Sequence, residues 1–364
     1  MNIECVSPKT EQHVTNQINL IGCTMAELKD LVRQWGWEDF RTQQITSWVY
    51  KKGIHHFKEM TNLSQSGREF LEQTVTLSKL KLVETQVSER DGTIKFLFQL
   101  KDNEKIESVF MPTDKRRTLC LSTQVGCPLR CSFCLTGKVG FKRNLDAGEI
   151  IDQVISTSSL LSQELPLSPK QHPVTNVVFM GMGEPLLNWP EVSRAISILQ
   201  SDYGPSIGSR KITVSTAGIA DKIEELASDP IKFKLAISLN SADDDQRSYL
   251  MPINKIFPLN KLIKAVKKFS TTRRERVTFE YVLIDSLNDS LEDAKRLADL
   301  IRGIPCKINL IPYNEIPGKT FKAPSEKVIL QFQNYLYQHC PAVTLRKSRG
   351  QDILGACGQL RACY

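Results

Sequence analysis

The feature that most constrains the fold is a regular alternation of short apolar runs with longer helical stretches, which begins at Arg117. Apolar runs rich in β-branched residues predict buried strands, and apolar residues at every third or fourth position predict helices. The expected strands, six in number, are TLCLSTQVG, VTNVVFMGMG, KITVSTAG, FKLAISLN, VTFEYVLI and KINLIPYN. Repeated β/α units with right-handed crossovers form a parallel sheet, so the expected class is α/β, as an open doubly wound sheet or an incomplete barrel.

Small polar residues follow most of these expected strands, in the tails STQVG, GMGEP, STAG, SLNS and IPYN. The carboxyl ends of parallel strands lie at one edge of a sheet or barrel, and both architectures build their ligand sites there. The active site is therefore expected at this edge.

The residues before the alternation divide into three parts. Residues 1–20 show no periodic pattern and predict a flexible tail, whereas residues 21–78 are helical in periodicity, with Thr24 placed to cap the first helix. Residues 79–114 alternate apolar and polar side chains around an Asp-Gly pair and predict a β-hairpin or meander that acts as a linker. The main domain is expected over residues 115–364.

Composition and charge restrict the setting of the chain. Hydrophobic residues at 41% and charged residues at 24% are ordinary for a globular protein. The first residues lack the order of a signal peptide, and no apolar run approaches the roughly 20 residues of a membrane span, so we expect a cytoplasmic protein with no membrane partner. The net charge of +8, with basic clusters at DKRR, GFKRN, TTRRER and RKSR, predicts a polyanionic partner, RNA or DNA first.

Three cysteines lie close together in the segment GCPLRCSFC, at Cys127, Cys131 and Cys134. In a reducing compartment such clustering indicates metal or thiol chemistry rather than a disulfide framework. The spacing C-x3-C-x2-C can hold three irons of a [4Fe–4S] cluster and leaves the fourth iron without a protein ligand. A structural zinc site is the alternative, but it needs four closed ligands, and no further Cys or His lies nearby downstream. The spacing therefore predicts an iron–sulfur cluster with one open iron.

This cysteine segment resembles that of the radical S-adenosylmethionine enzymes, in which the amino and carboxylate groups of the cofactor occupy the open iron. The resemblance implies S-adenosylmethionine as a second cofactor and a partial (β/α)6 barrel of the TIM type. The segment VVFMGMGEPLLN is similar to the glycine-rich segment that receives the amino group of the cofactor. Glycines there let the backbone approach a ligand closely.

A narrower resemblance is to the dual-specificity RNA methyltransferases. It is carried by LCLSTQVGCPLRCSFCLTGKVGFKRNL, GMGEPLLN, VSTAG, LMPINKIFPL, IPYN and GACGQL, between residues 119 and 360. It implies methylation of C2 of a specific adenosine in 23S rRNA and in tRNA, next to the anticodon, with the helical N-terminal domain helping to grip the RNA. It also implies a monomer that receives electrons from a donor such as flavodoxin with its reductase.

Matching positions carry over the cofactor contacts of that family. The implied residues are Gly183, Glu184, Ser215, Ser238, Leu239, Asn240 and Asn314. At Asn240 the family more often has histidine, but asparagine retains a donor and an acceptor. Ser215 and Asn314 follow strands, where polar residues otherwise often cap the next helix.

Three catalytic residues are expected only through this resemblance. The C2–H bond of adenine is neither acidic enough for an ordinary base nor nucleophilic enough to attack a sulfonium methyl group. The resemblance implies that Cys357 first accepts a methyl group, that hydrogen abstraction makes this group a radical that adds to C2, and that Cys120 then attacks the Cys357 sulfur and leaves a disulfide. Glu107 matches the proton acceptor of the family. On the residues alone, Cys120 would be an ordinary strand cysteine and Glu107 a solvent-facing hairpin residue.

Two other functions use the same sequence features. A sister group methylates C8 of adenosine with the same cysteines, but it usually lacks proline after the glycine-rich glutamate, so Glu184-Pro185 favours C2. A non-catalytic RNA-binding protein stapled by a metal would need neither Cys120 nor Cys357. The sequence does not distinguish a preference for rRNA from one for tRNA, and it does not identify the reductant.

Overall fold

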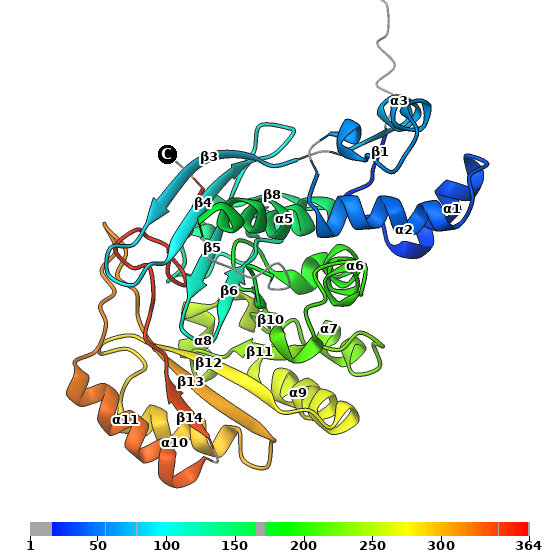
Figure 1. Ribbon diagram of the computed structural model, residues 1–364. Helices are drawn as coiled ribbons and strands as arrows, with labels where there is room; N and C mark the ends of the chain where they lie inside the picture. The colour runs from blue at the N-terminus through cyan, green and yellow to red at the C-terminus, as the bar shows by residue number, and fades with distance from the viewer. Residues whose placement is uncertain (1–16, 55, 78, 165–171, 341, 363–364) are drawn as a thin grey trace, which may run out of the picture.

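The computed structural model describes residues 17–364, apart from residues 55, 78, 165–171, 341, 363 and 364 (Figure 1). Most of the predicted N-terminal tail lies outside the described residues. A sheet of ten strands runs through the molecule in the order β14-β13-β12-β11-β10-β9-β6-β5-β4-β3. These strands are β3 Lys81–Val87, β4 Ile94–Gln99, β5 Lys105–Pro112, β6 Arg117–Cys120, β9 Asn176–Phe179, β10 Ile212–Thr216, β11 Lys234–Ser238, β12 Val277–Leu283, β13 Cys306–Pro312 and β14 Val343–Leu345.

The six predicted strands are β6, β9, β10, β11, β12 and β13, and each pairs in parallel with the next strand in this order. A seventh parallel strand, β14, joins β13 and was not predicted, because its three residues include two exposed side chains and so lack an apolar run. All seven residues of β12 are buried. This burial on both faces is typical of a parallel sheet covered by helices, and each large apolar side chain so buried contributes about 1.5–3 kcal/mol.

Helices follow the parallel strands as predicted. The predicted helices are α5 Ala147–Glu164, α6 Trp189–Gln200, α7 Ala220–Leu226, α9 Leu259–Arg273, α10 Leu291–Leu300 and α11 Glu326–His339. The short helix α8 Asp244–Leu250 was not predicted. Figure 1 shows α5, α6, α7 and α9 along one side of the sheet, and α10 and α11 near the strands β12 to β14. The carboxyl ends of the strands line the cavity described below.

The predicted β linker is part of the central sheet. β3 pairs with β4, β4 with β5, and β5 with β6, all antiparallel. Val109 of β5 stands opposite Cys120 of β6. The hairpin strands therefore extend the parallel sheet at the β6 side and place residues 105–112 next to the expected site.

The N-terminal helices form a separate layer against α5 and α6. They are α1 Met25–Gln34, α2 Phe40–Thr46 and α3 Gln65–Thr74, and the strands β1 Ile18–Asn19 and β2 Val75–Thr76 pair in parallel at their base. Thr24 caps α1 in a capping box with Glu27, as its sequence position predicts. Arg194 of α6 donates to Gly22 O at 2.7 Å and pairs with Glu27 at 2.6 Å, which joins this layer to the main domain. Within the described residues, no helix has the length and apolar character needed to cross a membrane.

Candidate active site

The three clustered cysteines lie on a loop that leaves the short hairpin of β7 Gln124–Gly126 and β8 Phe141–Asn144. Gly126 has φ of 75°, and a Cβ added there would lie 1.6 Å from Gly140 O. Only glycine fits this close approach, because any side chain would meet the backbone of the opposite strand. Cys127 N donates to Gly140 O at 3.0 Å, so the hairpin fixes the start of the cysteine loop.

Distant segments hold the rest of this loop. Ser132 N donates to Leu250 O at 2.9 Å, and Leu135 N donates to Gly358 O at 2.8 Å. The second bond links the cysteine loop directly to the residue after Cys357. The loop is therefore attached on one side to α8 and on the other to the C-terminal segment.

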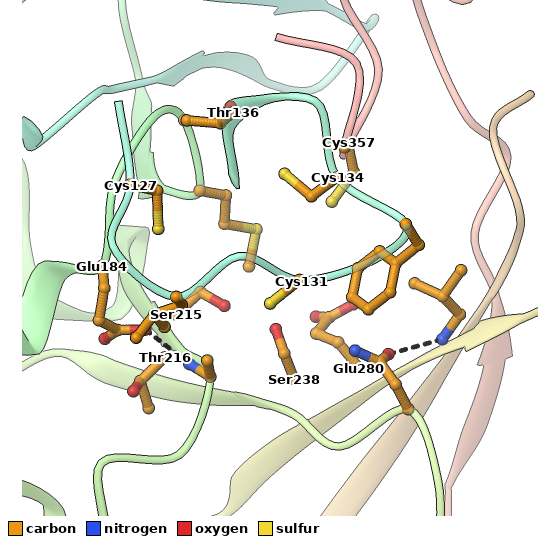
Figure 2. Close-up of a pocket in the computed structure, with 18 of the residues that line it drawn as sticks. Cys127, Cys131, Cys134, Thr136, Glu184, Ser215, Thr216, Ser238, Glu280 and Cys357 are labelled. Atoms are coloured by element: carbon orange, nitrogen blue, oxygen red, sulfur yellow. Dashed lines mark hydrogen bonds between the residues drawn. The ribbon is translucent and has the colours of Figure 1, made fainter. Parts of the chain in front are cut away.

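Cys127, Cys131 and Cys134 all line one cavity at the carboxyl ends of the strands (Figure 2). The described residues contain no group of three or more His, Cys, Asp or Glu side chains placed to hold a single metal ion. A [4Fe–4S] cluster needs a different arrangement, because each thiolate binds its own iron and the sulfur atoms stand around a cube rather than around one point. Three thiols facing one cavity fit that requirement.

Burial controls the acidity of these thiols. It raises the pKa of Cys127 to about 12 and holds the pKa of Cys131 well above its usual value, with neighbouring thiols as a further cause for Cys131. A metal ligand must be the thiolate, so the positive charge of iron has to supply the stabilisation that the protein does not.

The glycine-rich segment after β9 passes close to the chain between Leu121 and Gln124, which leads from β6 to β7. Gly183 has φ of 102°, and a Cβ there would lie 2.6 Å from Gln124 Cβ. A Cβ at Gly181 would lie 2.6 Å from Leu121 O. Both glycines line the cavity, so their lack of side chains brings the backbone to the cavity wall.

Glu184 lies in the wall of the same cavity but is already hydrogen-bonded to the backbone. Its Oε2 accepts from Ala217 N at 2.7 Å and its Oε1 from Leu186 N at 3.1 Å. Burial raises its pKa to about 7, and these two bonds act in the opposite direction. The carboxyl group therefore joins the segment after β9 to the end of β10, and Figure 2 shows Glu184 beside Ser215 and Thr216.

The other predicted cofactor contacts divide into two groups. Ser215, Ser238 and Asn240 line the cavity. Asn240 has φ of 60° and accepts from Val282 N at 2.9 Å, which turns the chain at the end of β11. Leu239 is fully buried and does not line the cavity, and Asn314 lies outside it as well. Asn314 Nδ2 instead donates to Cys357 O at 2.9 Å, so the structure places Asn314 as a support for the Cys357 backbone.

Cys357 lies between two cavities. It lines the cavity of the cysteine loop and also a second cavity, which Cys120 and Arg346 line as well. Cys357 is accessible to solvent, yet the surrounding protein raises the pKa of its thiol to about 11, and Arg346 acts in the opposite direction. Burial raises the pKa of Cys120 to about 12. Both are free thiols, so the predicted disulfide between them has no support in this structure.

Glu107 is not the solvent-facing residue that its hairpin position suggests. Its side chain is 1% exposed and lies 3.3 Å from Lys95 Nζ. Its Oε2 accepts from Arg361 N at 2.7 Å and from Ala362 N at 3.0 Å. Glu107 lines neither of the two cavities that contain Cys357, and in this arrangement it holds the C-terminal segment against β5.

Sequence reasoning missed three charged residues of the site. Glu280 on β12 and Arg346 after β14 line the first cavity. Arg247 of α8 is fully buried and donates to the carbonyl groups that end β10 and β11. For Glu280 a signal was present, because it is the only charged residue in the otherwise apolar run VTFEYVLI. Arg346 was assigned only to a basic cluster, and Arg247 gives no local signal.

The basic clusters are not all available to a polyanion. Arg273 is buried and donates to Leu226 O, Asp229 O and Ile231 O. Arg143 pairs with Asp102 and Glu149. The guanidinium groups of these two arginines, which belong to the clusters TTRRER and GFKRN, therefore support the fold.

Comparison with known proteins agrees with this geometry over almost the whole chain. The family model described as the ribosomal RNA large subunit methyltransferase N-terminal domain matches residues 18–77, and the model of the radical SAM superfamily matches residues 121–301. Relatives named dual-specificity RNA methyltransferase RlmN include those of Syntrophus aciditrophicus, 44% identical over 95% of this chain and 97% of the relative, and Geobacter sulfurreducens, 43% identical over 94% and 92%.

A solved structure has the same fold. The radical SAM methyltransferase from Sphaerobacter thermophilus superposes with a TM-score of 0.90 at 41% identity, covering 95% of this chain and 100% of the other. This similarity extends over the sheet, the cysteine loop and the N-terminal helices together. It does not favour a metal-stapled protein without catalytic activity.

Proposed function

The chain belongs to the dual-specificity RNA methyltransferases, and from this we propose that it methylates C2 of an adenosine in 23S rRNA and in tRNA. It is a radical S-adenosylmethionine enzyme, an RNA methyltransferase that uses a [4Fe–4S] cluster and S-adenosylmethionine. The observation that carries the assignment of residues is the place of Cys357. Cys357 lines one cavity together with the cysteine loop and a second cavity together with Cys120. A cysteine that carries a methyl group from the cofactor and is later released by a second thiol must lie between these two groups.

In this proposal the first cavity holds both cofactors. Cys127, Cys131 and Cys134 bind the cluster, and the bare backbone at Gly183 faces the amino acid part of the cofactor. When bound, the cluster and S-adenosylmethionine supply a methyl group for Cys357 and a 5′-deoxyadenosyl radical that removes hydrogen from it. The proposed cofactor site is completed by residues that contact the cofactor or shape the cavity wall, namely Glu184, Ser215, Ser238, Leu239 and Asn240. Asn314 holds the Cys357 loop.

Cys357 and Cys120 act in sequence. Methyl transfer requires the Cys357 thiolate, and Arg346 is the cation in the cavity wall that favours it. Once the methylene group on the Cys357 sulfur is joined to C2 of adenine, Cys120 attacks that sulfur. The bond between that sulfur and the methylene carbon breaks, and its electron pair passes to the methylene carbon and the adenine ring. That carbon then takes up a proton to become the methyl group, and the two sulfurs stay joined until they are reduced.

Glu107 is proposed as the group that takes the C2 proton. The Oε2 atom of Glu107 accepts hydrogen bonds from Arg361 N and Ala362 N. The C-terminal segment must therefore move away from Glu107 before this carboxyl group can reach an adenine in the cavity. Arrival of RNA is the event that we propose displaces this segment. Lys95 Nζ, 3.3 Å from Glu107 Oε1, then remains as the charged partner of this carboxyl group.

The surrounding assignments follow the same proposal. Residues 21–78 grip the RNA, residues 79–114 connect to the catalytic part, and residues 115–364 carry the chemistry. The enzyme works as a monomer in the cytoplasm and receives electrons from a donor such as flavodoxin with its reductase. The net charge of +8 supports binding to RNA.

Removing each thiol tests the proposal. In Cys357→Ala no methyl carrier remains, so neither 2-methyladenosine nor a protein–RNA adduct forms, whereas Cys120→Ala still adds to RNA and stays covalently attached to it. Denaturing electrophoresis with and without nuclease detects the adduct, and nucleoside mass spectrometry identifies the product. Glu107→Gln is expected to accumulate the same adduct.

Cys306→Ala is the matched control, because Cys306 is a buried cysteine on β13 outside both cavities. It should methylate RNA like the wild type. A nuclease-sensitive adduct in Cys357→Ala, or 8-methyladenosine as the wild-type product, would contradict the proposed function.

A further inference from the structure

Glu280 presents an unused hydrogen-bond acceptor to the first cavity. The residue is 6% exposed, and its Oε2 is buried with no hydrogen-bond partner in the described part of the chain. Leaving a buried acceptor unsatisfied is costly, so such atoms in a native protein mark a place where a partner binds. Figure 2 shows Glu280 in the cavity wall close to Ser238.

A row of polar residues across four strands orients this carboxylate. Ser238, Glu280, Asn309 and Thr344 are register partners on β11, β12, β13 and β14, so their side chains stand on one face of the sheet. Thr344 Oγ1 donates to Asn309 Oδ1, which turns the amide nitrogen of Asn309 toward Glu280. Asn309 Nδ2 donates to Glu280 Oε1 at 2.9 Å. One carboxylate oxygen is thereby fixed, and the other is left for the cavity.

Arg346 does not provide the missing partner. It lines the same cavity, but the hydrogen bond described for its guanidinium group runs from Nη1 to Met180 Sδ at 3.9 Å. Arg346 does lower the pKa of Glu280, whereas burial raises it. The carboxylate is therefore close enough to feel this cation without being hydrogen-bonded to it.

We propose that Glu280 Oε2 accepts a hydrogen bond from the ribose diol of S-adenosylmethionine, which makes Glu280 a further residue of the cofactor site. A carboxylate matches a pair of ribose hydroxyls, and this pairing recurs in nucleotide-binding sites. The inference rests on the proposed cofactor site, whose wall Glu280 shares with Ser238 and the three cysteines. A nucleoside inside an RNA chain has no free 3′-hydroxyl, so the diol belongs to the cofactor.

The test is equilibrium binding to anaerobically reconstituted protein of matched iron content, by isothermal titration calorimetry. Glu280→Ala should bind S-adenosylmethionine roughly 10- to 100-fold more weakly than the wild type, as expected for loss of a hydrogen bond to a charged group. S-Adenosylhomocysteine should lose affinity by the same factor, because its ribose is identical. Loss confined to S-adenosylmethionine would mean that Glu280 acts on the sulfonium charge, and would overturn the proposal.

A ligand without the diol gives the sharper result. The 2′,3′-dideoxyribose analogue of S-adenosylhomocysteine should bind weakly to the wild type, and Glu280→Ala should weaken it no further. Equal additional weakening would show that Glu280 does not contact the diol. Thr344→Val, which frees the Asn309 amide, should lower S-adenosylmethionine affinity by a smaller factor of about 3. Unchanged affinity in Thr344→Val would overturn the orienting role of the row.

Glu315→Gln is the control, because Glu315 is an exposed carboxylate that follows β13 and does not line the cavity. It should bind all three ligands as the wild type does. If the wild type itself fails to bind S-adenosylmethionine, the cofactor site is wrong. If the wild type binds and Glu280→Ala binds equally well, only the role of Glu280 fails.

Discussion

Arg247 is the side chain on which the shape of the cavity most depends. It is fully buried on α8, and its Nη2 donates to Ala217 O at 2.7 Å at the end of β10. Its Nε donates to Leu239 O at 3.0 Å at the end of β11, and its Nη1 to Asn254 Oδ1 at 2.8 Å. Replacement by methionine keeps much of the volume and removes all of these bonds.

The magnitude follows from two opposing contributions. Hydrogen bonds from a charged donor contribute about 1.5–3 kcal/mol each, so these three contribute roughly 5–9 kcal/mol, without the longer bond from Nη2 to Ser238 O at 3.3 Å. Burial lowers the pKa of Arg247 to about 10 from 12.5, and at about 1.4 kcal/mol per pKa unit this opposes folding by roughly 3 kcal/mol. Arg247→Met is therefore expected to lower the free energy of unfolding by about 4 kcal/mol.

Urea denaturation followed by circular dichroism measures this loss, with the midpoint and slope fitted for each variant. Arg302→Met is the control, because the ion pair of Arg302 with Asp299 lies on the surface and should contribute less than about 1 kcal/mol. Cofactor affinity should also fall in Arg247→Met, since Ser215 and Ser238 lie on the strands that Arg247 joins. A loss below about 1 kcal/mol with unchanged affinity would refute the reasoning.

Three further predictions concern pH, backbone and charge. Burial raises the pKa of Asp152 to about 6, so the folded state binds more protons than the unfolded state between about pH 4 and 6. The free energy of unfolding should therefore fall by up to about 3 kcal/mol as the pH rises through this window. Urea titrations at several pH values measure this dependence, and Asp152→Asn should remove it. Gly126→Ala should lower the iron content after reconstitution, because the new Cβ would lie 1.6 Å from Gly140 O, and full iron loading would count against the fixed hairpin. RNA affinity should fall as the salt concentration rises. The double variant Arg274→Ser, Arg276→Ser should show a smaller slope of log affinity against log salt concentration without loss of stability. Arg273→Ser should instead destabilise the fold by about 2–4 kcal/mol, because Arg273 is hydrogen-bonded to three carbonyl groups, and filter binding and thermal denaturation of both variants separate these outcomes.

The sheet and the place of the site could be predicted because both follow from local patterns. Strands such as β12 read as apolar runs in the sequence, and helices such as α5 read as apolar residues at helical spacing. Parallel strands then bring their polar tails to one edge whatever the details of packing. Ser215 and Ser238 line the cavity for this reason.

The three-dimensional partners of other predicted residues could not be read from the sequence. Asn314 ends a strand, as the other polar tails do, yet its amide is directed to the carbonyl of Cys357. Glu107 alternates with apolar neighbours as a surface residue would, but the C-terminal segment covers it. Sequence periodicity reports which face of a strand a side chain occupies, and it does not report what is packed on that face.

The position of Cys357 shows where local sequence ceases to be sufficient. Gly350 N donates to Asp91 Oδ2 at 3.0 Å across 259 positions, and Arg361 N to Glu107 Oε2 at 2.7 Å across 254. These two bonds attach both ends of the Cys357 loop to the antiparallel hairpin strands, which also carry the pairing partner of Cys120. The separation of Cys357 and Cys120 therefore depends on strands β3 to β5 as well as on the bonds that Leu135 N and Asn314 Nδ2 make to the Cys357 segment. The hairpin that the sequence presents as a linker thus helps to bring the two thiols to one cavity.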